Sequence, residues 1–195
     1  MATEFEFEVP TWNDIYNMLI DLADGVRKSN FNPDILVGIS RGGWLPTRIL
    51  SDLLDNPFIT SIGVSFYVGV YETKSEPVLT QPLSISAFGK KILLVDDVVD
   101  TGKSAMLIRG HLERDGVKEI KLLSLYYKPW SVTIPDFYSK ETKDWIVFPW
   151  ELRETLRKLK EKCKGKNTLF LEAKSRLVRA GVNEKLIELL LKDIS

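Results

Sequence analysis

The chain has 195 residues and a mass of 22.3 kDa, with 27 basic and 27 acidic side chains and a formal net charge of zero. Its 44% hydrophobic and 28% charged residues are typical of a globular protein and exclude a disordered or fibrous chain. No uncharged apolar run approaches the ~20 residues that a membrane-spanning helix requires. Residues 1–10 alternate Phe and Glu, whereas a signal peptide would begin with basic residues. We therefore expect a cytoplasmic protein with no membrane partner.

The single cysteine, Cys163, and the single histidine, His111, limit the chemistry that the chain can carry. One cysteine excludes an internal disulfide and fits a reducing compartment. A zinc site built from Cys or His ligands is also excluded in practice, because it needs three or four such side chains.

Charge is distributed unevenly along the chain. Residues 1–151 hold 15 basic and 21 acidic side chains, whereas residues 152–195 hold 12 and 6. We expect a domain boundary near Trp150, with a main domain over residues 1–151 and a basic helical C-terminal extension over residues 152–195. A solvated helical surface is the favoured reading of this basic segment, and a patch for phosphate, nucleic acid or acidic lipid is the alternative.

The N-terminal part predicts an amphipathic helix of about four turns. Thr11 is a suitable N-cap, and the acidic Asp14 follows three positions later. Apolar residues then recur at helical spacing. They are Ile15, Leu19, Leu22 and Val26.

The next segments predict alternating strands and helices. Residues 35–39 form an apolar run typical of a buried parallel strand. A glycine-rich turn over residues 40–43 precedes a helical pattern over residues 44–54. Residues 58–71 are rich in β-branched and aromatic side chains and predict a strand. Residues 72–89 show no period and predict a mobile loop.

A second strong strand signal covers residues 91–95, and a helix is expected to follow residues 96–104 and to end near Asp115. Residues 120–126 and 145–148 predict two further strands. This order predicts an α/β fold, a mostly parallel sheet with helices on both faces. Ligands of such sheets bind at the carboxyl ends of the strands, where both glycine-containing turns are expected.

The C-terminal segment predicts helices over residues 151–163 and 168–180, separated by a break at residues 164–167. Asn183 is expected to cap a last helix that ends near Lys192.

The most informative segment is the one after the strand at residues 91–95. Asp96 and Asp97 are adjacent carboxylates suited to a vicinal diol, and they could hold Mg²⁺ next to substrate oxygens. Asp100 follows, and the next four residues open a helix. Their backbone N–H groups, hydroxyls and helix dipole suit a phosphate. These four residues are Thr101, Gly102, Lys103 and Ser104.

The run from Ile92 to Ser104 resembles the phosphoribosyl pyrophosphate motif of type I phosphoribosyltransferases. The segment lacks the glycine that a Walker A loop needs four residues before Gly-Lys, so it is not such a loop. The resemblance implies the type I phosphoribosyltransferase fold with a small hood over the base site. It also implies that Asp96 and Asp97 bind the ribose hydroxyls and that residues 100–104 bind the 5′-phosphate.

The turn after the first predicted strand resembles the pyrophosphate loop of the same family. Glycines allow the backbone to approach an anion, and Arg41 adds a guanidinium group. In relatives the peptide that enters this loop can be cis, which here is Ser40–Arg41. The resemblance assigns the loop to substrate binding through Ser40, Arg41, Gly42 and Gly43.

Three further features are Asp100 in the second loop, Lys128 after the strand at residues 122–127, and Trp145-Ile146 followed by Pro149-Trp150-Glu151. Together they resemble the 6-oxopurine branch of the family, especially the bacterial xanthine–guanine enzymes. The resemblance implies that Lys128 donates to the purine O6, that Trp145 stacks on the ring and that the main chain of Ile146 meets the 2-position edge. Asp100 is expected near N7 as the general acid or base. Adenine is rejected, because its N6 amino group is itself a donor.

The implied activity is transfer of 5-phosphoribosyl from phosphoribosyl pyrophosphate to N9 of guanine, xanthine or hypoxanthine, with Mg²⁺ as cofactor. Family resemblance also implies a homodimer or a larger homo-oligomer, and the segment 72–89 occupies the place of the family's closing loop. The first alternative is a regulator of the same fold that senses the donor or a nucleotide, although no nucleic-acid partner is expected. The second is an enzyme that uses orotate or uracil, which Asp100 with Lys128 argues against.

Overall fold

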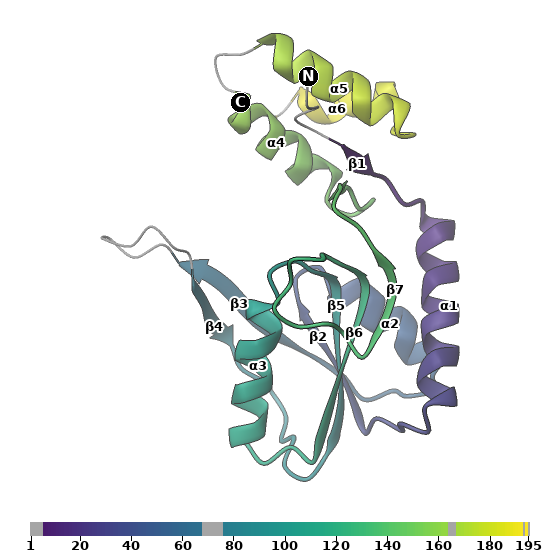
Figure 1. The fold of residues 1–195 in the computed structure, drawn as a ribbon, viewed down its shortest axis with the longest axis vertical. Coiled ribbons are helices and arrows are strands. Elements are labelled where there is room, and N and C mark those ends of the chain that lie inside the picture. Colours follow the sequence, from purple (N-terminus) through teal and green to yellow (C-terminus); the bar gives the residue numbers. More distant parts are fainter. Residues whose placement is uncertain (1–5, 68–75, 164–166, 193, 195) are drawn as a thin grey trace. The chain divides into compact units, whose positions relative to one another are not determined.

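The computed structural model describes residues 6–67, 76–163, 167–192 and 194 (Figure 1). In chain order the elements are β1 Phe7–Glu8, α1 Trp12–Lys28, β2 Ile35–Ser40, α2 Trp44–Leu53, β3 Ile59–Tyr67, β4 Glu76–Gln81, β5 Lys91–Val99, α3 Lys103–Arg114, β6 Glu119–Tyr127, β7 Phe137–Glu141, β8 Trp145–Ile146, α4 Leu152–Lys162, α5 Asn167–Arg179 and α6 Glu184–Leu191. Among these described helices, none combines the length and the apolar character needed to cross a membrane.

The chain forms two compact units. The sheet unit comprises Tyr16–Thr142, and the terminal unit comprises Met1–Ile15 together with Lys143–Ser195. The terminal unit therefore joins the whole of the predicted extension, residues 152–195, to β1 and β8.

The sheet unit contains a six-stranded sheet in the order β4-β3-β2-β5-β6-β7. All neighbouring strands are parallel except β3 and β4, which are antiparallel. The predicted mostly parallel sheet is confirmed. Strand β5 lies between β2 and β6, with Val95 opposite Gly38 and Asp96 opposite Ser124.

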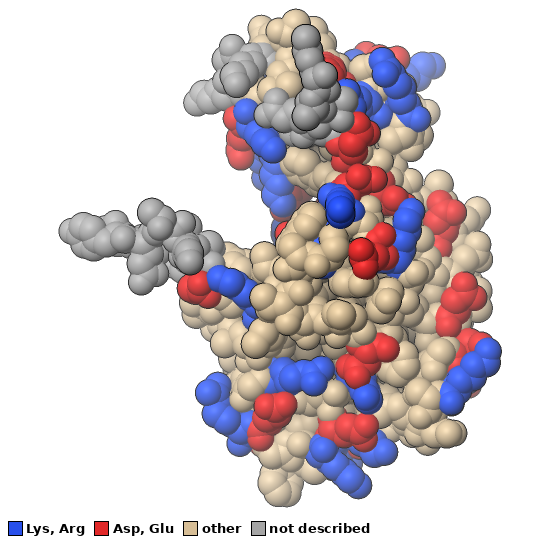
Figure 2. Space-filling view, viewed as in Figure 1, with Lys and Arg blue, Asp and Glu red and all other residues tan. Residues whose placement is uncertain are grey.

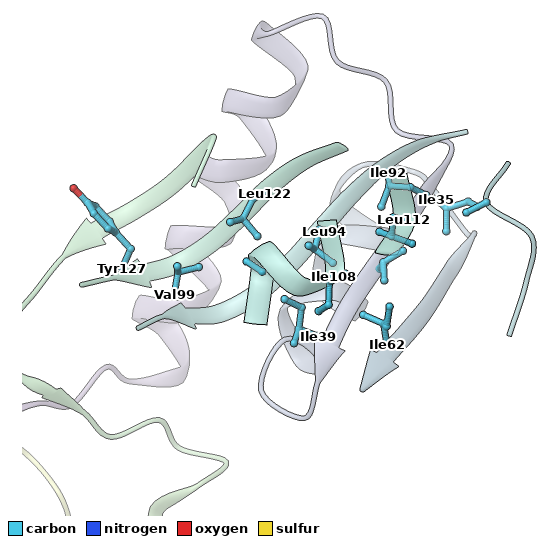
Figure 3. Close-up of a cluster of buried hydrophobic side chains, with 13 residues drawn as sticks. Ile35, Ile39, Ile62, Ile92, Leu94, Val99, Ile108, Leu112, Leu122 and Tyr127 are labelled. Carbon is cyan, nitrogen blue, oxygen red and sulfur yellow. The ribbon is translucent and has the colours of Figure 1, made fainter. Parts of the chain in front are cut away.

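Helix α3 covers one face of the sheet with a continuous apolar cluster (Figure 3). Its Ile108 and Leu112 are fully buried. They pack with alternate residues of the strands, because successive side chains in a strand point to opposite faces. Strand residues of this cluster include Ile35, Val37, Ile39, Ile62, Ile92, Leu94, Val99 and Leu122.

Helices α1 and α2 lie on the side of the sheet away from α3 (Figure 1). The apolar stripe predicted for α1 is confirmed, since Leu19 is fully buried and Val26 is 1% exposed. Thr11 caps this helix as expected: its Oγ accepts from the N–H of Asp14, and its own N–H donates to the Asp14 carboxylate. Helix α2 contacts β2 and β5, so the central strands are covered on both faces.

The prediction of a loop throughout residues 72–89 is wrong, because β4 occupies Glu76–Gln81. Pro and, to a lesser degree, Glu are depleted in strands, but antiparallel pairing with β3 overrides this preference. Pro77 is tolerated because β4 is an edge strand with one unpaired side. Residues 68–71 of the predicted strand and residues 72–75 of the segment likened to a closing loop lie outside the described residues.

The fourth predicted strand, residues 145–148, does not belong to the main sheet. Strand β8 covers only Trp145–Ile146 and pairs in parallel with β1 in a separate two-stranded sheet. The sixth strand of the main sheet is instead β7. Most side chains of β7 are exposed and three of its five residues are polar, so the sequence contained no apolar run that would predict this strand.

The terminal unit has its own apolar core. Helices α4, α5 and α6 pack with Val147, which follows β8, and Phe7 and Trp145 border the cluster. The predicted C-terminal helices are confirmed, and the Asn183 side chain accepts from the N–H of Leu186. The predicted break falls mostly on residues 164–166, which are outside the described residues. Basic and acidic side chains alternate on the visible surface of this unit (Figure 2).

Candidate active site

Two loops leave the sheet at the same edge. One follows β2 at Ser40, and the other follows β5 at Val99. Because β2 and β5 are parallel neighbours, their carboxyl ends and both loops lie side by side.

The first loop, residues 40–43, is tightly built. The Ser40–Arg41 peptide is cis, as the resemblance suggested. The N–H of Gly43 donates to Ile39 O over 2.9 Å, and Thr47 Oγ1 donates to Gly43 O over 2.6 Å. The Arg41 side chain is exposed at the turn. The loop thus presents a fixed backbone and one cation at the sheet edge.

Gly42 brings the first loop against β5. A Cβ atom at Gly42 would lie 2.0 Å from Asp97 Oδ2, and one at Gly43 would lie 2.2 Å from Val95 O. Any larger residue at either position would displace the loop from the strand. The close approach joins the predicted pyrophosphate loop to the acidic pair.

The acidic pair lies within β5 rather than after it, since the strand runs on to Val99. Asp96 is half-buried and lines a cavity, whereas Asp97 is 7% exposed and lies against Gly42. This divergence follows from the alternation of side chains along a strand. The N–H of Asp97 donates to Asp96 Oδ1 over 3.1 Å, and the N–H of Val98 donates to Asp97 Oδ1 over 2.9 Å.

Burial raises the pKa of Asp96 well above its ordinary value, and the neighbouring charge of Asp97 raises it further. Both effects disfavour the ionised form of Asp96. A bound cation or a hydroxyl donor would relieve them. A cation or a hydrogen-bond donor bound next to Asp96 would therefore stabilise its ionised form.

The second loop, residues 100–104, leads into α3. Gly102 is the N-cap and has a φ of +77°, a conformation that favours glycine. The first-turn N–H groups of α3 begin here, next to the hydroxyls of Thr101 and Ser104. The Lys103 ammonium pairs with Glu76 Oε1 on β4 over 2.6 Å. The arrangement is that of an anion site at a helix N-terminus.

A cavity of about 510 Å³ opens between these loops and β3. Asp96, Asp100 and all four residues from Thr101 to Ser104 line it, together with Ser40 from the first loop. Val64 and Phe66 of β3 add an apolar wall, which no sequence motif had indicated. One cavity thus combines carboxylates, an anion site and apolar surface.

Lys128 and Asp100 are linked by a residue that sequence reasoning missed. Trp130 Nε1 donates to Asp100 Oδ1 over 2.8 Å, and Lys128 Nζ lies 5.6 Å from the centre of the Trp130 ring. Lys128 itself is 7% exposed, and its N–H donates to Val99 O over 3.0 Å. The signal was Pro129, which suits the second position of a turn and could have indicated that the chain reverses here.

Trp145 and Ile146 belong to the terminal unit. There the Trp145 ring lies 6.0 Å from that of Phe7, and Ile146 is 4% exposed. Both residues are therefore held firmly in β8, and their predicted contacts with a purine stay predictions.

The donor atoms of the acidic pair are of the kind that Mg²⁺ binds; Asp96 brings its carboxylate to the cavity, whereas that of Asp97 lies against Gly42. Asp96 and Asp97 provide hard carboxylate oxygens. In the described part of the chain, no group of three or more His, Cys, Asp or Glu side chains could hold a metal ion. Mg²⁺ commonly takes one or two carboxylates and completes its shell with water and substrate phosphates, and this site suits that mode.

Comparisons with known proteins agree with this geometry. The family model described as the phosphoribosyl transferase domain matches residues 10–155. A xanthine-guanine phosphoribosyltransferase of Gluconobacter oxydans is 30% identical over 143 residues, which cover 72% of this chain and 82% of that protein. A hypoxanthine-guanine phosphoribosyltransferase of Schizosaccharomyces pombe is 28% identical over 183 residues, covering 74% and 88%.

Among solved structures, a purine phosphoribosyltransferase of Pyrococcus horikoshii superposes with a TM-score of 0.67 at 36% identity. The match covers 74% of this chain and 93% of that chain. Since the family match spans both loops, the acidic pair and Lys128, the chain belongs to the phosphoribosyltransferase family.

Proposed function

We propose that this protein transfers the 5-phosphoribosyl group from phosphoribosyl pyrophosphate to N9 of a 6-oxopurine. The C1–oxygen bond to pyrophosphate breaks, and its electron pair leaves with pyrophosphate. The N9 lone pair forms the new C1–N9 bond, and the proton on N7 is released to a base. The products are a purine nucleoside monophosphate and pyrophosphate, as in purine salvage.

The observation that carries this proposal is the cavity between the two loops. Its anion site at Thr101–Ser104 suits the 5′-phosphate, and Asp96 lies on its wall for the ribose hydroxyls. The first loop, with Gly42 against Asp97, offers its backbone and Arg41 to the departing pyrophosphate. Names of the relatives support the same reaction class.

Asp100 and Lys128 supply the purine chemistry. The Asp100 carboxylate lines the cavity and would accept the N7 proton. The Lys128 ammonium would donate to O6, which is an acceptor in guanine, xanthine and hypoxanthine alike. Adenine has an amino group at that position. The Lys128 ammonium would then meet another hydrogen-bond donor, and adenine would be bound poorly. Trp145 would stack on the ring, and the main chain of Ile146 would meet its 2-position edge.

Magnesium is the cofactor that we propose for this reaction. Asp96 and Asp97 would hold it, with phosphate and ribose oxygens of the donor completing its shell. When bound, Mg²⁺ would neutralise charge on the leaving pyrophosphate.

A spectrophotometric assay tests the proposal. Purified protein is mixed with phosphoribosyl pyrophosphate and Mg²⁺, and with xanthine, guanine, hypoxanthine or adenine in turn. We expect turnover of at least one 6-oxopurine and none of adenine. Lys128→Ala should raise KM for the purine and weaken the discrimination against adenine. A wild-type protein that converts no 6-oxopurine would contradict the proposal.

We also propose that the protein acts in the cytoplasm as a homodimer or larger homo-oligomer without nucleic acid. The terminal unit supports the last point, because several of its cations are already paired with acids of the same unit. Lys158 pairs with Glu154, and Arg176 pairs with Glu6. Light scattering after size exclusion measures the subunit number. A DNA titration across salt concentrations should show no steep salt dependence.

A further inference from the structure

We propose that Trp130 is a positioning residue that orients Asp100 and Lys128 for the reaction, an inference that rests on the proposed function. The indole makes two kinds of contact, one through its N–H group and one through the face of its ring. Its N–H donates to one oxygen of Asp100, and its ring face lies under the Lys128 ammonium. A single side chain thus joins the proton acceptor to the group that recognises O6.

The hydrogen bond fixes the carboxylate. At 2.8 Å between Trp130 Nε1 and Asp100 Oδ1, it has the normal length for an N–H donor. Asp100 is itself exposed on a loop, so its side chain has many rotamers to choose from in water. The directional donor engages Oδ1 and thereby restricts the rotamers of a carboxylate that lines the cavity.

The ring fixes the ammonium. Lys128 Nζ lies 5.6 Å from the ring centre, within the range of a cation–π contact. A lysine has a long flexible stem, and a ring face restricts where its charge can lie. The contact therefore limits the positions of the donor proposed for O6.

Backbone contacts hold Trp130 in place. The N–H of Ser131 donates to Lys128 O over 2.9 Å, which closes a turn around Pro129 and Trp130. The N–H of Val132 then donates to Thr101 O over 3.1 Å. Gly102 allows this approach, since a Cβ atom there would lie 2.6 Å from Ser131 Oγ. The turn is thus tied to the loop that carries Asp100.

Burial in a core does not explain the position of this tryptophan. Trp130 is 53% exposed, so replacing it removes little packing. Trp12 has the same exposure of 53%, and its ring contacts Trp150, for which no contact with substrate is proposed. Substitution of Trp12 therefore serves as a control for substitution of Trp130 at equal exposure.

Steady-state kinetics of full-length Trp130→Phe and Trp130→Ala test the proposal, with Trp12→Phe as control. Phenylalanine keeps a ring for Lys128 but removes the N–H, so kcat should fall about tenfold while KM for the purine changes less than about twofold. Alanine also removes the ring, so KM for the purine should rise about threefold as well. Trp12→Phe should leave both constants unchanged.

A double-mutant cycle separates positioning from a merely structural role. If Trp130 acts through Asp100, adding Trp130→Phe to Asp100→Asn should lower the residual kcat no further. Melting temperatures of all variants, measured in parallel, show that each is folded.

The outcomes are distinct. An active wild type with an unchanged kcat in Trp130→Phe overturns the role of Trp130 and leaves the proposed function intact. Independent, multiplicative losses in the double mutant also overturn it. A wild type without activity on any 6-oxopurine overturns the proposed function and this inference together.

Discussion

Asp96 is a partly buried carboxylate whose ionisation costs the folded chain stability. Its carboxylate is half-buried in β5 beside Asp97, and burial followed by that neighbouring charge raises its pKa. The folded chain therefore binds the Asp96 proton more tightly than the unfolded chain does. As pH rises above the ordinary value of 3.8, the unfolded state ionises first and gains relative stability.

We predict that Asp96→Asn increases the free energy of unfolding at pH 7 in the absence of ligand. The gain should disappear below about pH 4, where Asp96 is protonated in both states. The same variant should bind phosphoribosyl pyrophosphate and Mg²⁺ more weakly, because a neutral amide replaces a charged acceptor. Urea titrations at pH 3.5 and 7 measure the first effect, and calorimetry measures the second. Loss of stability at pH 7 would refute the prediction.

Asp100 also lines the cavity but differs from Asp96 because its side chain is exposed. In Asp100→Asn, the amide oxygen can still accept from Trp130 Nε1, so the local geometry should survive while the proton acceptor is lost. We predict that kcat falls by about 10²–10⁴-fold, the usual contribution of a general base, while KM for the donor changes little. Asp52→Asn, on α2 and outside the cavity, is the control. Unchanged turnover in Asp100→Asn would exclude this role.

At the scale of elements, helix α1 begins with a reciprocal capping arrangement. Thr11 Oγ1 donates to Asp14 Oδ2 over 2.6 Å, and the Thr11 N–H donates to the same oxygen over 2.8 Å. These hydrogen bonds lower the pKa of Asp14 below 3.8. A lowered carboxyl pKa adds stability above the unfolded value, and this stability is lost as pH falls through the folded value.

We predict that Thr11→Ala lowers the free energy of unfolding by about 1 kcal/mol at pH 7, the usual cost of an N-cap. The difference from wild type should shrink as pH falls below 3.8, because a protonated Asp14 no longer serves the cap. Denaturant titrations between pH 2 and 7 measure it. A difference that stays constant over this range would show that Asp14 takes no part.

The elements that the sequence predicted well are those whose local signals agree with their surroundings. Buried strands such as β2 and β5 are continuous apolar runs, and the motif that follows β5 is specific enough to locate the cavity. Strand β4 was missed because its pairing with β3, not its composition, makes it a strand. Strand β8 was assigned to the wrong sheet, since a short apolar run does not say which partner it will meet.

The candidate site shows the same limit. Asp96, Asp100 and the residues from Thr101 to Ser104 could be identified from their order along the chain, and they line one cavity. Trp130 could not, because its role depends on a turn that directs the indole back to Asp100. Contacts across a loop are set by three-dimensional closure, which a linear pattern does not encode.

At the scale of the whole molecule, a segment near the N-terminus pairs with a strand that follows the main sheet in the chain. Residues near the N-terminus pair with β8, through the N–H of Trp145 to Glu6 O and that of Val147 to Glu8 O. Helices α4 to α6 then cover this small sheet with a separate apolar core. The residues expected to contact the purine, Trp145 and Ile146, therefore depend for their support on helices that lie largely beyond the family match, which ends at residue 155.

We predict that Leu177→Ala destabilises the terminal unit and, through it, purine binding. Leu177 on α5 is fully buried, so the truncation should cost roughly 2–5 kcal/mol. Hydrogen exchange should quicken at the amides of Trp145 and Val147 and stay unchanged in β5, since the sheet unit has its own core. If Trp145 and Ile146 bind the base, KM for the purine should rise while KM for the donor stays near the wild-type value.

Leu171→Ala is the matched control, because Leu171 lies on the same helix and is 61% exposed. Equal loss of protection in β5 would show that the two units unfold as one, and an unchanged purine KM despite faster exchange at β8 would remove Trp145 and Ile146 from the base site.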